Sequence, residues 1–389
     1  MKQIITSVLL ALVAMTAAAN DGTYFTDGNQ LIPLQETQIS VKKEVLTISL
    51  RDNGYADVDV YYEFYNPEST TKSVKMGFEA DPPYNDAYEF YPSGVHPYIK
   101  NFTVEMNGKK IDHDNAVAIS SEDKVPQIIN VSDWKFDDDD MGMTLTNKQT
   151  GEQKGFSYVY YFYADFKPGK NIVHHTYSYC LSVIVGTTWD LSYKLSPAAR
   201  WANKRIDDFT LVIKAENTAK HFLIDKKVFG ADNRFVKKSG NMKMRTLPDG
   251  SGRWEIALRN GEAQIHLYNF TPNPEEELNI FSADTYYSYG ADKYQYGAFY
   301  DRSSPSFVYM AETMEPTNIA PADKAFRQRI CHNLPFAHRG HIFKDARLKK
   351  FFESQFWYMP DPSYKDDTSD FTKTDKEVMN HKIGHLSEE

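Results

Sequence analysis

The chain has 389 residues, with 44 basic and 53 acidic side chains, a net charge of −9 and two cysteines. This length suits two or three ordinary domains, and the apolar content is sufficient for folded cores. The composition excludes a disulfide-stapled miniprotein, a collagen-like fibre and a largely disordered chain. The acidic balance argues against a nucleic-acid partner.

The N-terminus has the pattern of a secretory signal peptide. Lys2 gives a short positive segment, the stretch from Ile4 to Met15 is apolar apart from two hydroxyl residues, and three alanines ending at Ala19 form a cleavage site. The apolar stretch is shorter than the roughly 20 residues of a membrane-spanning helix. We therefore predict a signal peptide at residues 1–19, export to the periplasm or to the extracellular cell surface, and no transmembrane segment.

Residues 20–150 are predicted to form a β-sandwich-like module. Apolar and polar side chains alternate from Thr47 to Leu50 and from Val58 to Phe64, as they do in half-buried strands. Asn107 and Gly108 follow another alternating stretch, and both residue types tolerate the positive φ angles of a two-residue hairpin turn.

A second β module is predicted at residues 151–285. The stretches from Tyr158 to Phe166 and from Val173 to Val185 are rich in aromatic and β-branched residues, which favour strands. Shorter alternating stretches follow at residues 209–213, 254–258 and 263–268. Because no helical pattern separates these strands, the sequence favours sandwich-like modules over βαβ units.

The pattern changes towards the C-terminus. A Tyr/Pro-rich linker is predicted at residues 286–321, and a helical domain at residues 322–389. The expected fold class is therefore mainly β, with two β-sandwich-like modules, followed by a small all-α C-terminal domain.

Two helices of this domain have recognisable starts. Large apolar residues recur at every fourth position from Leu348 to Phe356, which predicts one apolar helix face. Asp345 is the candidate N-cap of that helix. Thr372 and Asp375 have the spacing of a capping box, which predicts the start of a last helix.

The C-terminal region resembles the YARHG domain of exported bacterial proteins. Residues 333–343 read N-L-P-F-A-H-R-G-H-I-F, and the hallmark of the family is Tyr-Ala-Arg-His-Gly followed by an aromatic residue and a helix. A Trp-Tyr-x-Pro element follows from Trp357 to Pro360, at the distance that the family has. The resemblance covers residues 322–386 and implies a cell-envelope protein.

The motif differs from the family pattern in two places. Phe336 stands where the family has tyrosine, so a hydrogen bond from that hydroxyl is absent. His338 and Arg339 stand in the inverse of the family's Arg-His order, which aims the two side chains differently.

The β region is similar to a family of exported bacterial proteins of unknown function. The residues that carry this similarity are those from Asn20 to Gly22, from Thr187 to Trp189 and from Asp208 to Thr210. Neither family brings an established catalytic residue.

The strongest charge pattern lies in residues 324–350, where eight basic residues stand against one acidic residue, a net charge of +7. A basic surface attracts anionic partners, and arginine grips carboxylates through two hydrogen bonds. Nearby aromatic side chains would offer stacking surfaces for sugars. The candidate ligand-binding residues are Arg327, Arg329, His338, Arg339, His341, Trp357 and Tyr358.

The same residues have plainer interpretations. The charges would solvate exposed helix faces, or they would dock the helical domain onto the acidic β region. Burial of His338 or Arg339 against aromatic residues, paired with a carbonyl or carboxylate group, is favoured over a zinc site.

No metal, cofactor or catalytic residue is assigned from the sequence. The run from Asp137 to Asp140 lacks the spacing of an EF-hand and favours a solvated loop. Cys180 and Cys331 would form a disulfide in an oxidising compartment, or would remain two separate buried thiols. The sequence has no nucleophile elbow, Walker loop, dinucleotide fingerprint or kinase element.

We therefore expect an exported cell-envelope protein without catalytic activity, whose C-terminal helical domain recognises an anionic glycan or peptidoglycan-type ligand. A rival hypothesis is a hydrolase of envelope polymer, because the paired carboxylates of such enzymes leave no mark in the sequence. A third hypothesis is a structural scaffold for protein–protein contacts.

Overall fold

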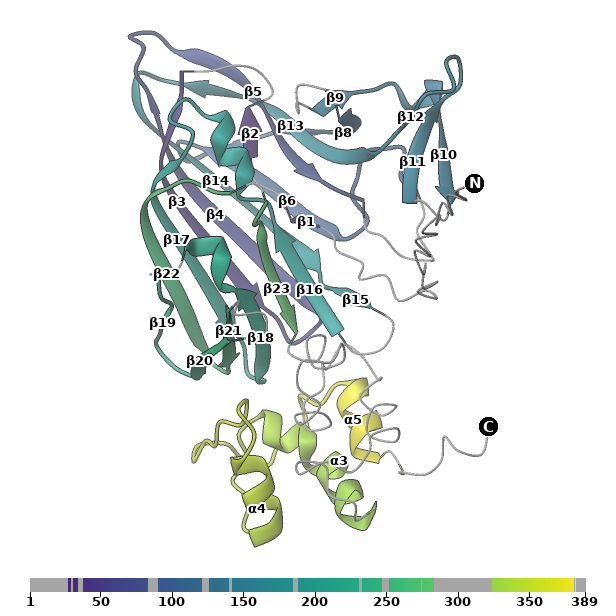
Figure 1. Ribbon diagram of the computed structural model, residues 1–389, viewed down its shortest axis with the longest axis vertical. Helices are drawn as coiled ribbons and strands as arrows, with labels where there is room; N and C mark the ends of the chain where they lie inside the picture. The colour runs from purple at the N-terminus through teal and green to yellow at the C-terminus, as the bar shows by residue number, and fades with distance from the viewer. Residues whose placement is uncertain are drawn as a thin grey trace, which may run out of the picture.

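The computed structural model describes residues 27–28, 31–33, 38–82, 90–120, 126–139, 142–184, 188–230, 233–246, 252–273, 275–282, 324–380 and 382. Strands predominate in this part of the chain, and three α-helices follow them (Figure 1). The predicted fold class is therefore confirmed. No helix among the described residues combines the length and the apolar character needed to cross a membrane. The predicted signal peptide (residues 1–19) and linker (residues 286–321) lie outside the described residues.

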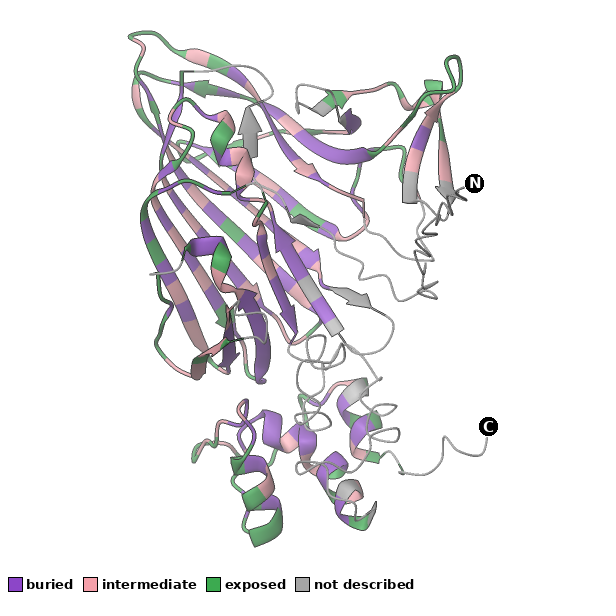
Figure 2. Ribbon diagram, viewed as in Figure 1, coloured by how far each residue is buried: buried purple, intermediate pink, exposed green. Residues whose placement is uncertain are grey.

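The largest sheet has eight strands. In spatial order they are β19 (Val236–Lys237), β22 (Gly261–Phe270), β17 (Ile206–Ala215), β3 (Ser40–Leu50), β4 (Tyr55–Asn66), β14 (Gly169–Cys180), β6 (Ile99–Met106) and β7 (Lys109–Ile111). β3 and β17 run parallel, whereas the other neighbours in this sheet are antiparallel. Val58, Val60 and Tyr62 of β4 are buried, and the residues between them are not, so one face of the sheet belongs to the core (Figure 2). The opposite face, called here the outer face, carries Asp57, Asp59 and Glu63 of β4 together with exposed tyrosines.

Two further sheets cover the buried face. One contains β1 (Asp27–Gly28), β16 (Thr188–Tyr193), β23 (Leu278–Ser282), β18 (Lys220–Asp225), β21 (Gly252–Leu258) and β20 (Asn241–Thr246), with β15 (Ser182–Ile184) beside β16. The other contains β2 (Leu31–Pro33), β5 (Lys72–Ala80), β13 (Phe156–Phe166), β8 (Asp114–Ser120) and β9 (Pro126–Ile128). The hydroxyl of Tyr62 in β4 lies 3.3 Å from that of Tyr193 in the first of these sheets. The ring of Phe64, also in β4, lies 5.4 Å from the ring of Phe166 in the second. The three sheets therefore share one hydrophobic core.

A small antiparallel sheet of β10 (Trp134–Asp139), β11 (Gly142–Asn147) and β12 (Gln153–Lys154) stands at the end of the β region opposite the helices (Figure 1). It corrects one prediction, because Asp137–Asp139 belong to strand β10 and not to a loop. The side chain of Asp137 accepts a hydrogen bond from Lys135. Asp140 lies outside the described residues.

The strands do not divide at residue 150. β14 of the predicted second module lies between β4 and β6 of the predicted first module, and β13 lies between β5 and β8. Strands from the two predicted modules therefore share sheets and one core. The number of independent domains in this region stays a prediction.

The predicted hairpin at Asn107 and Gly108 is confirmed. β6 and β7 pair in an antiparallel manner across these two residues, and both residues have positive φ angles, 51° and 76°. Asparagine and glycine adopt this conformation at low cost, which fixes the turn.

The C-terminal region contains α3 (Lys324–His338), α4 (Ala346–Glu353) and α5 (Lys373–Asn380). Asp345 caps α4 as predicted, because its carboxylate accepts hydrogen bonds from the backbone N–H groups of Arg347 and Leu348. Leu348 and Phe352 are buried, but α4 ends before Phe356, so that residue of the predicted apolar row is not helical.

The predicted capping box at the start of α5 is also confirmed. The backbone N–H of Asp375 donates to the Thr372 hydroxyl at 3.1 Å, and the backbone N–H of Thr372 donates to the Asp375 carboxylate at 2.8 Å. Two orphan N–H groups of the helix start are satisfied in this way.

The helical domain packs against one end of the β region (Figure 1). Ala219 and Ala257 of the β region belong to the hydrophobic cluster of the helical domain. The backbone N–H of Ala219 donates to the His338 carbonyl at 3.0 Å, and Arg259 forms an ion pair with Asp361 at 3.1 Å. The sequence suggested basic helices docked on an acidic β surface. In this ion pair the charges are the other way round, because the β region supplies the cation and the helical domain supplies the carboxylate.

Candidate functional site

The motif from Phe336 to Gly340 forms the end of helix α3. Gly340 has a φ angle of +90°, and its N–H donates to the carbonyl of Ala337 at 3.0 Å. A Cβ atom at this glycine would lie 2.8 Å from the carbonyl oxygen of Met359 and 2.9 Å from the Arg259 guanidinium. The motif glycine is therefore required both by the left-handed conformation of the helix end and by the close approach of the β region.

Arg339 is an internal structural residue. Its guanidinium donates to the carboxylates of Asp370 and Asp375, each at 2.9 Å. It also donates to the Pro335 carbonyl at 2.8 Å and lies 4.1 Å above the Phe371 ring. Only 3% of the residue is exposed. The prediction that Arg339 is buried against an aromatic ring and paired with carboxylates is confirmed, and this arrangement leaves it little surface for an external ligand.

Three more candidate residues also lie inside the helical domain. His338 is buried with its ring 4.4 Å from that of Trp357, which is buried too. Tyr358 is mostly buried and its hydroxyl donates to the His341 carbonyl at 2.5 Å. His338, Trp357 and Tyr358 therefore pack inside the domain, and their rings do not form an exposed stacking surface.

The remaining basic residues of the predicted patch differ in their surroundings. His341 and Arg329 lie nearer the surface, each beside a carboxylate: His341 with Asp366 and Arg329 with Asp345. Lys344, Lys349 and Lys350 are exposed. The side chain of Arg327 lies outside the described residues. Ligand binding by the seven candidate residues stays a prediction, but the described ones do not converge on one open site.

Both cysteines are free thiols in the structure. Cys180 is half-buried at the end of β14, and Cys331 is buried in the helical domain. Burial raises the pKa of the Cys180 thiol above its ordinary value. Among the described residues, no group of three or more His, Cys, Asp or Glu side chains is arranged to hold a metal ion.

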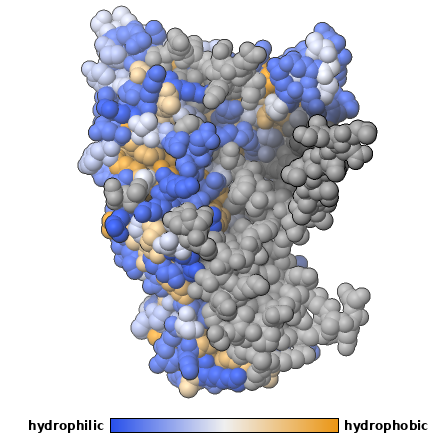
Figure 3. Space-filling view, in the orientation of Figure 1, coloured by the Kyte–Doolittle hydropathy of each residue, from blue (hydrophilic) through white to orange (hydrophobic). Residues whose placement is uncertain are grey.

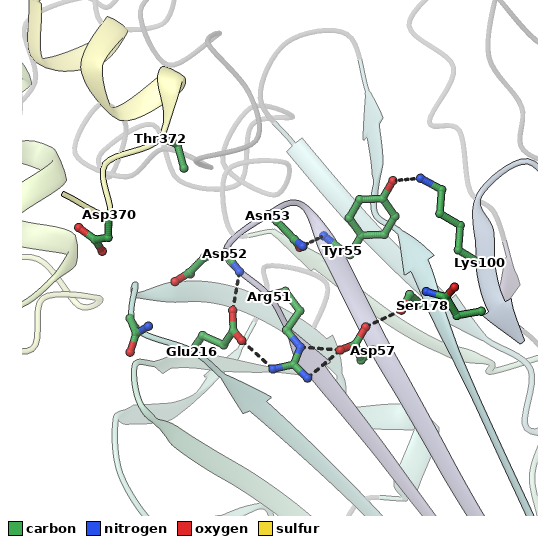
Figure 4. Close-up of a pocket in the computed structure, with 12 residues that line it drawn as sticks. Arg51, Asp52, Asn53, Tyr55, Asp57, Lys100, Ser178, Glu216, Asp370 and Thr372 are labelled. Carbon is green, nitrogen blue, oxygen red and sulfur yellow. Dashed lines mark hydrogen bonds and ion pairs between the residues drawn. The ribbon is translucent and has the colours of Figure 1, made fainter. Parts of the chain in front are cut away.

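A polar cleft lies where the end of the eight-stranded sheet faces the helical domain. It has a volume of about 610 Å³, within the range of ligand pockets. Its lining residues are Arg51, Asp52, Asn53, Tyr55, Asp57, Lys100, Asn101, Ser178, Glu216, Asn217, Asp370 and Thr372. The last two belong to the segment that leads into α5, and the others come from the ends of strands and from their connecting turns (Figure 4). This site is called the cleft.

Arg51 organises the centre of the cleft. Its guanidinium lies between two carboxylates, 2.7 Å from Asp57 and 2.6 Å from Glu216 (Figure 4). The hydrogen bond to Glu216 raises the pKa of Arg51 above its ordinary value. The Ser178 hydroxyl donates to the other oxygen of Asp57 at 2.7 Å, and the backbone N–H of Asp52 donates to Glu216 at 2.9 Å. These contacts therefore fix the orientation of the side chains at the centre of the cleft.

The far wall of the cleft is formed by Tyr55 and Lys100. The Lys100 ammonium donates to the Tyr55 hydroxyl (Figure 4), and this hydrogen bond raises the pKa of Lys100. Asn101 has a φ angle of +56° at a bulge, where the pairing of β6 with β14 shifts between Thr176 and Ser178. Bulges often re-aim side chains next to binding sites.

Sequence reasoning did not find this cleft. Its residues come from distant segments, such as Arg51, Lys100, Glu216 and Asp370, and no local spacing joins them. The one local signal is the turn at Asn53 and Gly54 between two alternating stretches, which marks the hairpin that carries Arg51 and Tyr55. On the side of the molecule drawn in Figure 3, hydrophilic residues predominate on the described β surface, with apolar patches among them.

Two family comparisons match parts of the chain. Residues 317–382 match the YARHG domain, and residues 19–150 match a domain of unknown function, DUF4424. Both predicted resemblances, at the C-terminus and in the N-terminal β region, are confirmed. No curated protein matches the chain.

Solved structures give more distant similarities. A candidate nutrient-binding protein from Legionella pneumophila is similar over 91% of this chain and 96% of its own, with 16% identity and a TM-score of 0.49. An M1 zinc metallopeptidase from Deinococcus radiodurans covers 60% of this chain and 43% of its own, with 10% identity and a TM-score of 0.23. A candidate protease from Parabacteroides distasonis covers 77% of this chain and 50% of its own, with 7% identity and a TM-score of 0.24. None of these similarities is close enough to assign a function.

Proposed function

We propose that this chain, which carries a YARHG domain at residues 317–382 and a DUF4424 region at residues 19–150, is an exported cell-envelope protein that binds a glycan or peptidoglycan-type ligand without catalysis. The YARHG domain is typical of exported proteins and supports a place in the periplasm or at the cell surface. The ligand is proposed to bind in the cleft, where the helical domain contributes Asp370 and Thr372.

The observation that carries this proposal is the preorganised network around Arg51. Its guanidinium, the two carboxylates beside it and the Ser178 hydroxyl are held by one another at 2.6–2.7 Å. Groups that are already oriented lose little conformational freedom when a ligand binds. Hydroxyl, carboxylate and ammonium groups in one open cleft suit a ligand that is rich in hydrogen-bonding groups.

The charges of the cleft refine the ligand expected from the sequence. Four carboxylates and two cations line the cleft, and Arg51 already pairs with two of the carboxylates. A strongly anionic ligand would therefore meet a surplus of negative charge. A neutral glycan, or a peptidoglycan fragment that carries both an amine and a carboxylate, fits this balance better.

The Arg51 network also favours binding over hydrolysis. A glycosidase needs one carboxylic acid that stays protonated and can donate to the leaving group. Asp57 and Glu216 instead both accept hydrogen bonds from the single guanidinium of Arg51. This pair therefore does not resemble the acid and base of such an enzyme.

The proposal is tested by co-sedimentation of the purified mature protein with insoluble peptidoglycan. Asn217 is exposed at the mouth of the cleft, so Asn217→Trp should fill the cleft without disturbing the core. We expect the wild-type protein to sediment with the polymer at low salt and the variant to lose at least nine-tenths of this binding. The matched control is Gln149→Trp, which places the same side chain at an exposed turn between β11 and β12.

Two results would contradict the proposal. If the wild-type protein stays in solution with peptidoglycan, the ligand class is wrong. If Asn217→Trp sediments as well as Gln149→Trp does, the site is wrong. Release of soluble fragments from peptidoglycan by the protein alone would favour the hydrolase hypothesis instead.

A further inference from the structure

A second hollow of about 450 Å³ adjoins the cleft on the outer face of the eight-stranded sheet. The two hollows share Arg51, Asp57, Asn101 and Ser178 in their linings. They therefore form one continuous depression, called here the sheet groove, which runs from the helical domain onto the middle of the sheet.

The floor of the second hollow is a grid of short polar side chains. In one row, Thr47 of β3 stands opposite Asp59 of β4, which stands opposite Thr176 of β14. The next row of the same face contains Ser49, Asp57 and Ser178 in the same strands. Neighbouring strands lie about 4.8 Å apart, so the rows offer hydroxyl and carboxylate groups at regular intervals.

The charges of the second hollow balance. Arg51 and Lys214 supply two cations, and Asp57 and Asp59 supply two carboxylates. Arg51 pairs with Asp57, and Asp59 accepts a hydrogen bond from His174 at 3.0 Å. A charged ligand would gain little in this hollow, whereas a neutral ligand with many hydroxyl groups could both donate and accept hydrogen bonds.

The strands under the groove leave no place for an added peptide strand. β4 lies between β3 and β14, and both ladders are continuous over these rows. A peptide that binds by strand addition needs an exposed sheet edge, which this central position does not provide. The two rows of the floor carry hydroxyl and carboxylate groups, and the apolar lining residues Val58 and Tyr177 are buried.

We propose that the sheet groove binds a linear, uncharged oligosaccharide chain that begins in the cleft and extends across β4 towards the row of Thr47 and Thr176. This inference rests on the proposed function, because it takes the cleft as one end of the binding site. It adds that the ligand is a chain of several sugar units and that its uncharged part lies on the sheet.

The test is calorimetric titration of the mature protein with β-1,4-linked N-acetylglucosamine oligomers of two and six units. We expect the hexamer to bind at least tenfold more tightly than the dimer, because only the hexamer is long enough to reach the second hollow. Since the ligand carries no charge, the dissociation constant should change less than twofold between low and high salt.

Substitutions in the second hollow then test whether the additional sugar units of the hexamer bind there. Thr47 lines that hollow and not the cleft, so Thr47→Arg should abolish the advantage of the hexamer and leave dimer affinity unchanged. Thr210→Arg is the matched control, since Thr210 lies on the same outer face, in β17, beyond the groove. A double Thr47→Val and Thr176→Val variant keeps the shape of both side chains and removes two hydroxyls, and it should weaken hexamer binding at least threefold.

The outcomes separate this inference from the proposed function. If peptidoglycan binding depends on Asn217 but the hexamer binds no better than the dimer, the sheet groove is wrong and the cleft stands. If the hexamer still binds more tightly than the dimer in both the Thr47→Arg and the double valine variants, the proposed binding in the sheet groove is also wrong. If the protein binds neither peptidoglycan nor the oligomers, both proposals fail.

Discussion

Arg339 and Arg329 lie ten positions apart and form ion pairs of different kinds. The Arg339 and Asp375 side chains are 3% and 0% exposed, whereas the side chains of Arg329 and Asp345 are 48% and 41% exposed. Removing one partner of a buried pair leaves an uncompensated charge in the interior. An exposed pair loses only an interaction that water already screens.

Arg339→Ala should therefore destabilise the helical domain by about 3–5 kcal/mol, and Arg329→Ala by less than about 1 kcal/mol. Urea denaturation followed by circular dichroism, with hydrogen exchange of α3 and α5, measures both effects. Equal losses in the two variants would show that Arg339 is not the internal support that its contacts indicate.

His175 has a buried side chain surrounded by aromatic rings. Its ring is packed among Tyr62, Tyr177, Phe78 and Phe102, with ring centroids 5.7–6.1 Å away, and neither ring nitrogen has a hydrogen-bond partner among the described residues. Burial lowers the pKa of His175 from 6.5 to about 3. Between these two values the unfolded chain binds a proton that the folded chain does not, so stability falls as the pH falls through this window.

This difference predicts acid sensitivity that depends on one side chain. Between pH 7 and pH 5, the wild-type protein should lose about 2 kcal/mol more stability than His175→Phe, which fits the aromatic surroundings and cannot be protonated. Urea titrations at the two pH values measure this difference. Gln149→Phe, at the exposed turn between β11 and β12, is the control and should retain the wild-type dependence, because it changes no titratable group. A His175→Phe protein with that same dependence would refute the assignment.

Helix α5 begins with the capping box, which also places Thr372 at the cleft. An N-cap hydroxyl satisfies a backbone N–H that would otherwise have no partner within the helix. The start of this short helix therefore supports both the fold of the domain and one wall of the site.

Thr372→Ala should lower the free energy of unfolding by about 1 kcal/mol, because it removes the oxygen that accepts from the Asp375 N–H. Thr372→Ser keeps this oxygen and should remain close to the wild type. Hydrogen exchange at the first turn of α5 reports the local effect. Similar exchange rates in the alanine and serine variants would contradict the role of the cap.

The elements that sequence patterns predicted are those with local causes. The Asn107–Gly108 hairpin, the Asp345 cap and the capping box of α5 each depend on residues within a few positions of one another. The parallel pairing of β3 with β17 has no local cause, because it joins strands separated by most of the β region. The cleft could not be predicted either, because its lining residues come from segments that are far apart in the sequence.

The predicted ligand-binding residues show a second limit of sequence reasoning. Charge and aromatic character suggested that Arg339 and Trp357 form a recognition surface, but both are buried. Composition reveals which groups are present and not whether they meet water or one another. The carboxylates that enclose Arg339 stand 31 and 36 positions further along the chain, at Asp370 and Asp375.

At the scale of the whole molecule, strands on the two sides of residue 150 complete one another's sheets. β14 supplies the hydrogen-bonding partner on one side of β4 and on one side of β6. The family match at residues 19–150 therefore ends within a shared core.

A fragment of residues 20–150 should consequently fail to fold, because β4 and β6 would lack the strand between them. A fragment of residues 20–285 contains all strands of the four sheets that the structure describes and should unfold cooperatively. Circular dichroism and urea titration of the two fragments measure this. A cooperative transition in the shorter fragment would establish it as an independent domain after all.

The pairing of β3 with β17 also bears on when the newly made chain can fold. Lys42 and Asp207, which meet across these two strands, are 165 residues apart. Pairings over such separations form slowly, since a long loop must close before the contact stabilises anything. A newly made chain thus cannot complete its central sheet until β17, which ends at Ala215, has been synthesised and more than half of the 389 residues have left the ribosome.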